Sequence, residues 1–185
     1  MTLTAEQLKQ ITPGTPLDRC KVFVPHLNKF LPLYGIDTPI EVASFLSQIL
    51  HESGGLKYLR EIWGPTKAQS RYEGRADLGN IIKGDGKLFM GRGLIQLTGR
   101  TNYARMSKEI FGDDRLVRNP EILATPEYGV LASCIYWKWR GMDSIDDDNS
   151  ITAETKKVNG GYNGLEDRQK YFDLAKAVLN IKPIP

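Results

Sequence analysis

The residue of this sequence best placed for acid–base chemistry is Glu52, which ends an apolar helical segment. In the stretch SFLSQILHESGGL (residues 44–56), Phe45, Ile49 and Glu52 follow one another at four and three residues, so Glu52 lies at the edge of the apolar face. Partial burial disfavours a carboxylate ion, and so does the negative end of the helix dipole. Both effects favour the neutral acid, the form that a general acid needs. A solvated terminal glutamate is the alternative that the pattern leaves open.

A second carboxylate is required if this acid works on a glycosidic bond, because such hydrolysis uses a pair of Asp or Glu residues. Glu61 follows Glu52 by nine residues (61 − 52), and a short excursion of the chain could return it to face Glu52 across a groove. Glu73, Asp77 and Asp85 are further candidates in the same region. Spacing alone does not decide among them.

Polar side chains in a glycine-rich stretch, residues 83–106, suggest a sugar-binding wall. Arg92, Gln96, Thr98 and Tyr103 offer donors and acceptors suited to hydroxyl and N-acetyl groups, and the glycines allow close backbone approach. A loop that caps the next helix explains the same residues without a ligand. No Gly-Lys-Ser/Thr end of a phosphate-binding loop follows, so nucleotide binding is not expected.

Three other side chains could support the carboxylates or a sugar. Arg168 lies in the first turns of a helix, where its guanidinium could pair with a carboxylate of the cleft; a surface pair with a nearby glutamate is the alternative. His51 is a favourable cation at the end of its helix, or a partner of Glu52, rather than a free-standing base. Tyr72, like Tyr58 and Trp63, could stack on a sugar face or pack in the core.

Helices must position these residues, because helix start and stop signals dominate the chain. Thr38 and Glu41 are spaced as a capping box, and Pro25 is expected to divide the second helix. Residues 57–93 lack a long apolar period and are predicted to be loops, with short strands possible near Leu88–Met90. The expected helices span residues 4–11, 15–35, 38–53, 101–112, 125–141, 150–161 and 164–180, followed by a tail at 181–185.

Composition limits the class of protein. With 185 residues, 41% hydrophobic and 25% charged, the chain suits a single globular domain. The net charge of +3 would favour an anionic target such as a bacterial envelope, but no basic patch indicates nucleic acid. Neither a membrane-spanning run nor a signal-peptide apolar region is present, so the chain is expected to stay in the cytoplasm until released.

Cysteine and histidine usage argues against a metal site. The two His and two Cys of the sequence do not match a zinc-ligand spacing, so neither metal nor cofactor is expected. Cys20 and Cys134 are expected to be buried thiols in a reducing cytosol.

Five blocks, in order, resemble the family 19 glycoside hydrolases, and the phage-type endolysins of that group most of all. They are FLSQILHESGG, LREIW, YEGRADLGN, GRGLIQLTGRTNY and VNGGYNGLEDR, and the resemblance covers roughly residues 35–175. It implies a mainly α, lysozyme-like domain with two lobes, a substrate cleft and at most a small β element. It also implies hydrolysis, with inversion, of β-1,4 linkages between N-acetylated amino sugars.

The resemblance assigns roles to individual residues. Glu52 matches the general acid and Glu61 the base that activates water. Plant-type members have a longer insertion between the two acids and carry disulfides, both missing here, so Glu73 stays open as the alternative base. Gln96 and Thr98 match residues that line the sugar subsites, and Asn159 matches the Asn-Gly-Gly block. Arg168 matches the arginine linked to the carboxylates, and Thr66 is a candidate for holding water.

The expected function is that of an endolysin with lysozyme activity. Residues 1–185 would form one catalytic domain without a cell-wall-binding module, acting as a monomer on the peptidoglycan glycan strand. It would wait in the host cytoplasm until a holin opens the membrane, then work in the periplasm and cell wall. The alternatives are a chitinase, a non-catalytic glycan-binding module, and an antibacterial toxin delivered between cells.

Overall fold

The fold is mainly α, as expected, in a computed structural model that describes residues 1–142 and 151–182. Position 150 of an expected helix and positions 183–185 of the expected tail lie outside the described residues. Within them there is no strand, and only isolated bridges join Arg60 to Arg92 and Arg92 to Leu97. The helices are α1 Ala5–Ile11, α2 Leu17–Phe30, η1 Pro32–Tyr34, α3 Pro39–Glu52, α4 Lys67–Ser70, η2 Ala76–Leu78, α5 Asp85–Leu88, α6 Arg100–Phe111, α7 Arg115–Arg118, η3 Pro120–Ala124, α8 Pro126–Trp139, α9 Thr152–Asn159 and α10 Leu165–Val178.

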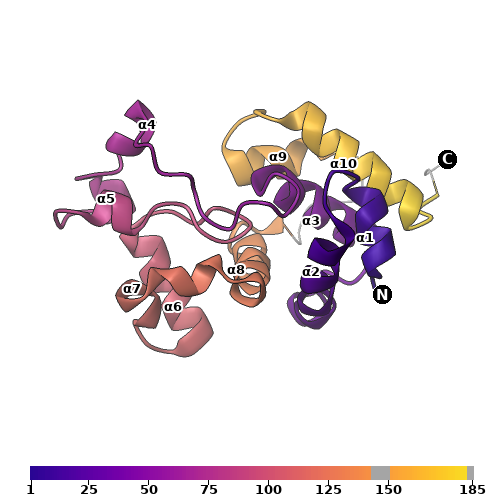
Figure 1. Ribbon diagram of the computed structural model, residues 1–185, viewed down its shortest axis with the longest axis horizontal. Coiled ribbons are helices and arrows are strands. Elements are labelled where there is room, and N and C mark those ends of the chain that lie inside the picture. The colour runs from indigo at the N-terminus through magenta and orange to yellow at the C-terminus, as the bar shows by residue number, and fades with distance from the viewer. Residues whose placement is uncertain (143–150, 183–185) are drawn as a thin grey trace.

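Two groups of helices form two lobes, each with its own hydrophobic core. Helices α1, α2, α3, α9 and α10 gather on one side of the molecule and α4 to α7 on the other, with α8 between them (Figure 1). Phe23, Phe45 and Ile49 belong to the core of the first lobe. Phe89 and Met106 belong to that of the second. Since apolar burial is the main favourable contribution to folding, each lobe is held together from within.

Helix α8 joins the lobes because it supplies side chains to both cores. Val130, Cys134 and Trp137 pack in the first core. Ala132 and Ile135 pack in the second. These two sets lie on opposite faces of the helix, as their spacing of three and four residues requires. The relative placement of the lobes therefore depends on one helix.

Helix α3 is the buried centre of the first lobe. Its start follows the sequence prediction: the side chain of Thr38 accepts a hydrogen bond from the backbone of Glu41, and Glu41 bonds back to the N–H of Thr38. Every residue from 42 to 50 is buried, and its most extensive packing is against α10. Gly54 and Gly55 follow with φ of 58° and 71°, a backbone conformation that favours glycine and ends the helix.

Residues 57–93, predicted to be loops, contain the short helices α4, η2 and α5. Two further sequence predictions about elements are wrong. Pro25 does not divide the second helix, which runs unbroken from Leu17 to Phe30; a proline there costs about 3 kcal/mol, and the buried side chains of Phe23 and Leu27 on either side of it offset that cost. Leu88–Met90 forms no strand, because α5 ends at Leu88 and Phe89 turns inward against the ring of Tyr103. No helix among the described residues is long and apolar enough to cross a membrane.

Both thiols are expected to be unreactive in the folded protein. Cys20 and Cys134 are free and fully buried, and burial raises the pKa of each. Because only the thiolate attacks a thiol reagent, Ellman's reagent at pH 8 should label neither cysteine until denaturant unfolds the chain, and both thereafter. Labelling of a cysteine in the native state would show that its core opens locally.

Candidate active site

Glu52 does not point freely into solvent. Its side chain is 24% exposed and bonds through Oε1 to Nη2 of Arg168, which is 1% exposed. The predicted pairing of this arginine with a cleft carboxylate is therefore seen in the structure. The guanidinium is a charged partner that the sequence-based arguments from burial and the helix dipole did not include. Within the described residues no hydrogen bond to Oε2 of Glu52 is present.

Gln48, which sequence reasoning missed, completes the support of Glu52. Its Oε1 accepts a hydrogen bond of 2.5 Å from Nη1 of Arg168, so one guanidinium binds two successive turns of α3. Ser44, one turn earlier, donates to the buried carboxylate of Glu154 on α9. The signal was present in the sequence as polar residues at four-residue spacing, 44, 48 and 52, on an otherwise apolar helix.

His51 lies against the connection between α9 and α10 and pairs with Asp167, Nδ1 to Oδ2 at 2.7 Å. Its ring covers Gly164, where an added Cβ would lie 2.1 Å from Cε1 of the ring. Asn159 ends α9 and donates to the carbonyl of Asn163 at 3.2 Å. His51 and Asn159 thus hold the turn that leads into α10, and with it Arg168.

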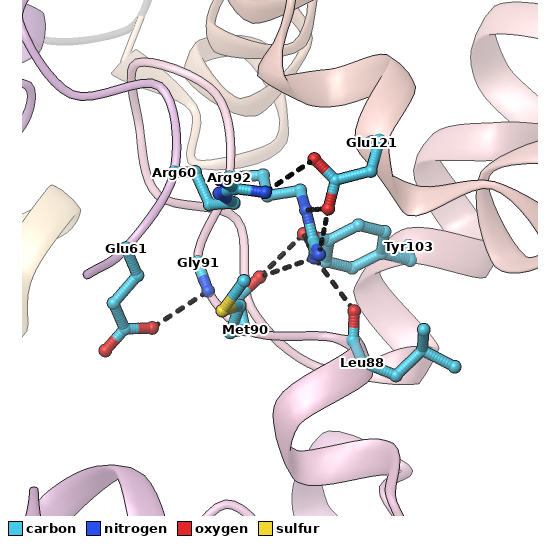
Figure 2. A network of polar contacts seen from close by, with 8 residues as sticks. All are labelled: Arg60, Glu61, Leu88, Met90, Gly91, Arg92, Tyr103 and Glu121. Atoms are coloured by element: carbon cyan, nitrogen blue, oxygen red, sulfur yellow. Dashed lines mark hydrogen bonds and ion pairs between the residues drawn. The ribbon is translucent and has the colours of Figure 1, made fainter. Parts of the chain in front are cut away.

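Glu61 is held by three neutral donors from two segments, residues 69–72 and residue 91. The backbone N–H of Gly91 donates to Oε2 at 3.0 Å. Nε2 of Gln69 and the hydroxyl of Tyr72 donate to Oε1 at 2.9 and 3.4 Å. Figure 2 shows the bond from Gly91. A carboxylate offers about four acceptor sites, so room remains for one water molecule. Glu61 therefore has the geometry of a fixed acceptor.

Gln69 was also missed by sequence reasoning, although it is nearly fully buried. Its Oε1 accepts from the backbone N–H groups of Gly64 and Thr66, which fixes the direction of its amide toward Glu61. Thr66, predicted to hold water, instead caps α4 by accepting from the N–H of Gln69. Thr66 therefore acts on Glu61 through Gln69.

The hydroxyl of Tyr72 contacts Glu61, and its ring lies beside that of Trp63. Burial raises the pKa of the Tyr72 phenol, and the adjacent Glu61 carboxylate raises it further. The hydroxyl therefore stays a donor at neutral pH. The ring of Tyr72 lies 6.3 Å from that of Trp63.

The prediction that Arg92 and Tyr103 contact a sugar is wrong, because both are buried, at 3% and 0% exposure. Their polar atoms are used internally: Tyr103 donates to the carbonyl of Met90, and Arg92 bonds to Tyr103 and Glu121. Burial raises the pKa of the Tyr103 phenol. These residues form the scaffold of the loop that carries Gly91.

Gln96 and Thr98 lie closer to the site and are partly exposed. A Cβ added at Gly91 would meet Oε1 of Gln96 at 2.8 Å and Oε2 of Glu61 at 3.3 Å, so both side chains flank this glycine. Thr98 donates to the carbonyl of Gln96, whose φ is 54°. The structure thus brings Gln96 together with Glu61.

The other acidic candidates have different partners. Glu73, the alternative base, accepts from the backbone N–H groups of Gly84 and Gly86 at 2.6 and 2.9 Å and so anchors the loop before α5. Asp77 pairs with Arg75 and Asp85 with Arg100. In the part of the chain that is described, no group of three His, Cys, Asp or Glu residues could hold a metal ion.

An open groove of ≈ 730 Å³ runs beside Glu61. Its lining combines aromatic, apolar and charged side chains, among them Tyr58, Trp63, Met90, Lys57 and Lys87. Such a mixture suits a sugar chain, whose faces are apolar and whose edges carry hydroxyl groups.

Comparison with known proteins points to one family, although no family model matches the chain. The chain is 28% identical over 165 residues to a glycosyl hydrolase family 19 domain-containing protein of Haemophilus influenzae, covering 75% of this chain and 80% of that protein. It is 34% identical over 180 residues to the endochitinase CHI of Arabidopsis thaliana, covering 92% of this chain and 63% of the plant protein's length.

Solved structures agree on the fold. All of this chain aligns with chitinase C of Streptomyces griseus, covering 79% of that chain at a TM-score of 0.73 and 20% identity. It aligns equally fully with a bacterial family 19 chitinase, covering 98% of that chain at a TM-score of 0.75 and 19% identity. The mainly α, lysozyme-like fold expected from the sequence is confirmed.

Substitution of Gly164 by alanine is expected to destabilise the protein. The residue has φ of 71°, and the new Cβ would collide with the His51 ring at 2.1 Å. Backbone strain of this kind costs about 1–3 kcal/mol, and displacement of the ring adds to it. Chemical denaturation should show the loss in the free energy of unfolding.

Gly160→Ala is the matched control, because Gly160 has φ of 74° and nothing within 4 Å of an added Cβ. Gly160→Ala should lower the free energy of unfolding through backbone strain alone, because the new Cβ meets no side chain. Equal losses in the two variants would show that His51 moves aside freely.

Proposed function

Because the sequence and the fold of this chain are those of a family 19 glycoside hydrolase, we propose that it cleaves β-1,4 bonds between N-acetylated amino sugars in chitin-type polymers. The observation that carries the proposal is the contrast between two carboxylates: Glu52 bonded to a buried cation and Glu61 held by neutral donors. Different surroundings let two carboxylates take the acid and base roles. The endochitinases among its relatives support the choice of polymer.

The proposed reaction is a single displacement. Glu52 gives its proton from Oε2 to the oxygen of the leaving sugar as the bond from that oxygen to the anomeric carbon breaks. Water attacks the same carbon from the opposite face and loses a proton to Glu61. Arg168 stabilises the Glu52 carboxylate that remains. The configuration of the anomeric carbon inverts.

Glu52→Gln and Glu61→Gln should each lower kcat on chitohexaose by about 10²–10⁴-fold, the usual contribution of one general acid or base. Both variants keep the size of the side chain, so circular dichroism should be unchanged. Gln96→Ala should lose less, mainly through a higher KM. Proton NMR of the first products of the unmodified protein should show the α-anomer.

Glu73→Gln is the control, since Glu73 bonds only to loop N–H groups in the described chain. Full activity of Glu61→Gln together with loss in Glu73→Gln would move the base to Glu73. Full activity of Glu52→Gln would remove the proposed acid.

Peptidoglycan is the second candidate substrate, favoured by the charges around the groove. Lys57 and Lys87 line it and have no ion-pair partner among the residues described. Peptidoglycan carries carboxylates on its lactyl groups and stem peptides, which chitin lacks. With this substrate the chain would act as an endolysin, released from the cytoplasm through a holin.

Reversing both charges, Lys57→Glu with Lys87→Glu, should slow the release of sugars from peptidoglycan about tenfold at low salt and leave chitohexaose hydrolysis unchanged. Loss of one exposed contact of this kind is worth up to about 1 kcal/mol and weakens with salt. Dye release from purified sacculi measures the first activity.

Lys21→Glu with Lys108→Glu is the matched control, because each double variant takes the net charge from +3 to −1 (3 − 4) but only one alters the groove. Equal loss of peptidoglycan hydrolysis in both double variants would show that the net charge of the protein, and not the groove, determines the effect. No loss in either would count against recognition of acidic glycans by the groove.

A further inference from the structure

We propose that Glu121, on η3, is a positioning residue for Glu61. The inference rests on the proposed function, in which Glu61 is the base. Glu121 makes no hydrogen bond to the Glu61 carboxylate, although both residues line the groove. Glu121 holds together the two chain segments whose pairing determines where the Glu61 oxygens lie.

The pairing between residues 59–61 and 91–93 extends over only a few residues. The N–H of Glu61 donates to the carbonyl of Gly91 at 2.8 Å, and the N–H of Gly91 returns a bond of 3.0 Å to Oε2 of Glu61. One step away, the N–H of Gly93 donates to the carbonyl of Leu59 at 2.9 Å. The Arg60–Arg92 bridge belongs to no strand, and the only further pairing beside it in the described chain is the single bridge between Arg92 and Leu97. Pairing as short as this is at best marginally stable in water, so contacts from other side chains are expected to help fix its register.

Glu121 supplies this support from both sides of the pairing. Its Oε1 accepts from Nε and Nη2 of Arg92 at 3.0 and 2.6 Å, and its Oε2 accepts from Nη1 of Arg60 at 3.3 Å. Arg60 directly precedes Glu61, and Arg92 directly follows Gly91. Figure 2 shows the single carboxylate bonded to residues of both segments.

The arginine on the Gly91 side is itself rigidly held. Nη1 of Arg92 donates to the carbonyl of Leu88 at 2.8 Å and to the hydroxyl of Tyr103 at 3.1 Å. The side chain is 4% exposed, and Glu121 is the only carboxylate that it contacts in the described chain. Loss of that carboxylate would leave a buried cation with neutral partners, which is unfavourable. The guanidinium would then shift and carry the 90–92 peptides with it.

A small shift is enough to matter for the base. Gly91 N–H is the donor that fixes Oε2 of Glu61. Misplacement of a reacting group by about 1 Å can cost about 10²-fold in rate. Glu121 itself is 50% exposed, so its replacement by glutamine leaves no cavity and tests the ion pair alone.

Glu121→Gln is expected to lower kcat on chitohexaose about tenfold, the effect of a partial misplacement of the base, with KM changed less than twofold. Glu127→Gln is the matched control. Glu127 also follows a proline at a helix start, is 41% exposed, and pairs with Lys29 in the first lobe. It should leave kcat unchanged, and circular dichroism at the assay temperature should show that both variants are folded.

A double-mutant cycle separates positioning from general damage. If Glu121 acts through Glu61, adding Glu121→Gln to Glu61→Gln should not lower the residual activity further. A tenfold further loss in the double variant, or a Glu121→Gln variant as active as Glu127→Gln, would overturn the inference. Full activity of Glu61→Gln alone would instead overturn the assignment of the base.

A second variant keeps the inference testable if the first does not fold. If Glu121→Gln does not fold, Arg60→Gln, with a side chain 57% exposed, removes only the contact on the Glu61 side. It should lower kcat less than tenfold and show the same absence of further loss in the Glu61→Gln background. Unchanged kcat would contradict the role of the pairing in positioning Glu61.

Discussion

A buried guanidinium organises the acid side of the site. Arg168 is the largest fully buried side chain of the described residues, and it bonds from α10 to Gln48 and Glu52 on successive turns of α3. Among the described residues, Glu52 is the carboxylate with which it forms an ion pair. Removing one member of a buried ion pair leaves an uncompensated charge and costs about 3–5 kcal/mol. The packing of α10 on α3 and the direction of the Glu52 carboxylate are therefore maintained by the same contact.

The two carboxylates are set up for different parts of one reaction. In the proposed reaction Glu52 gives up a proton as the bond breaks, and Arg168 pairs with the carboxylate that results. Glu61 has no contacting cation in the part of the chain that is described; Gln69, Tyr72 and Gly91 fix its position with neutral donors.

The sequence predicted best where local periodicity and chemistry coincide. The end of α3 and its capping box follow from helical spacing and capping residues. The pairing of Arg168 was one of two alternatives left open by the residues, and the family resemblance implied the one that the structure shows. The buried position of Arg92 could not be predicted from the sequence, because its partners are carbonyls and side chains brought together by loops. Gln69 lies in a segment without an apolar period, so no local signal marks its burial. At Pro25 a local signal was present but misleading, since packing overrides the strong tendency of proline to interrupt a helix.

Helix α8 contacts the segments that carry the two carboxylates, although neither carboxylate lies on that helix. Trp137 packs edge-on against Phe45 of α3, with ring centroids 5.4 Å apart, and so ties α8 to the helix that ends in Glu52. At the other end, η3 with Glu121 leads directly into α8. Gly129, in the first turns of α8, has no Cβ, and one added there would lie 3.1 Å from Leu59 and 3.6 Å from Gly93, the residues paired beside Glu61. Helix α8 thus contacts both the helix that ends in Glu52, the proposed acid, and the segments paired beside Glu61, the proposed base, and its two faces belong to the two different cores.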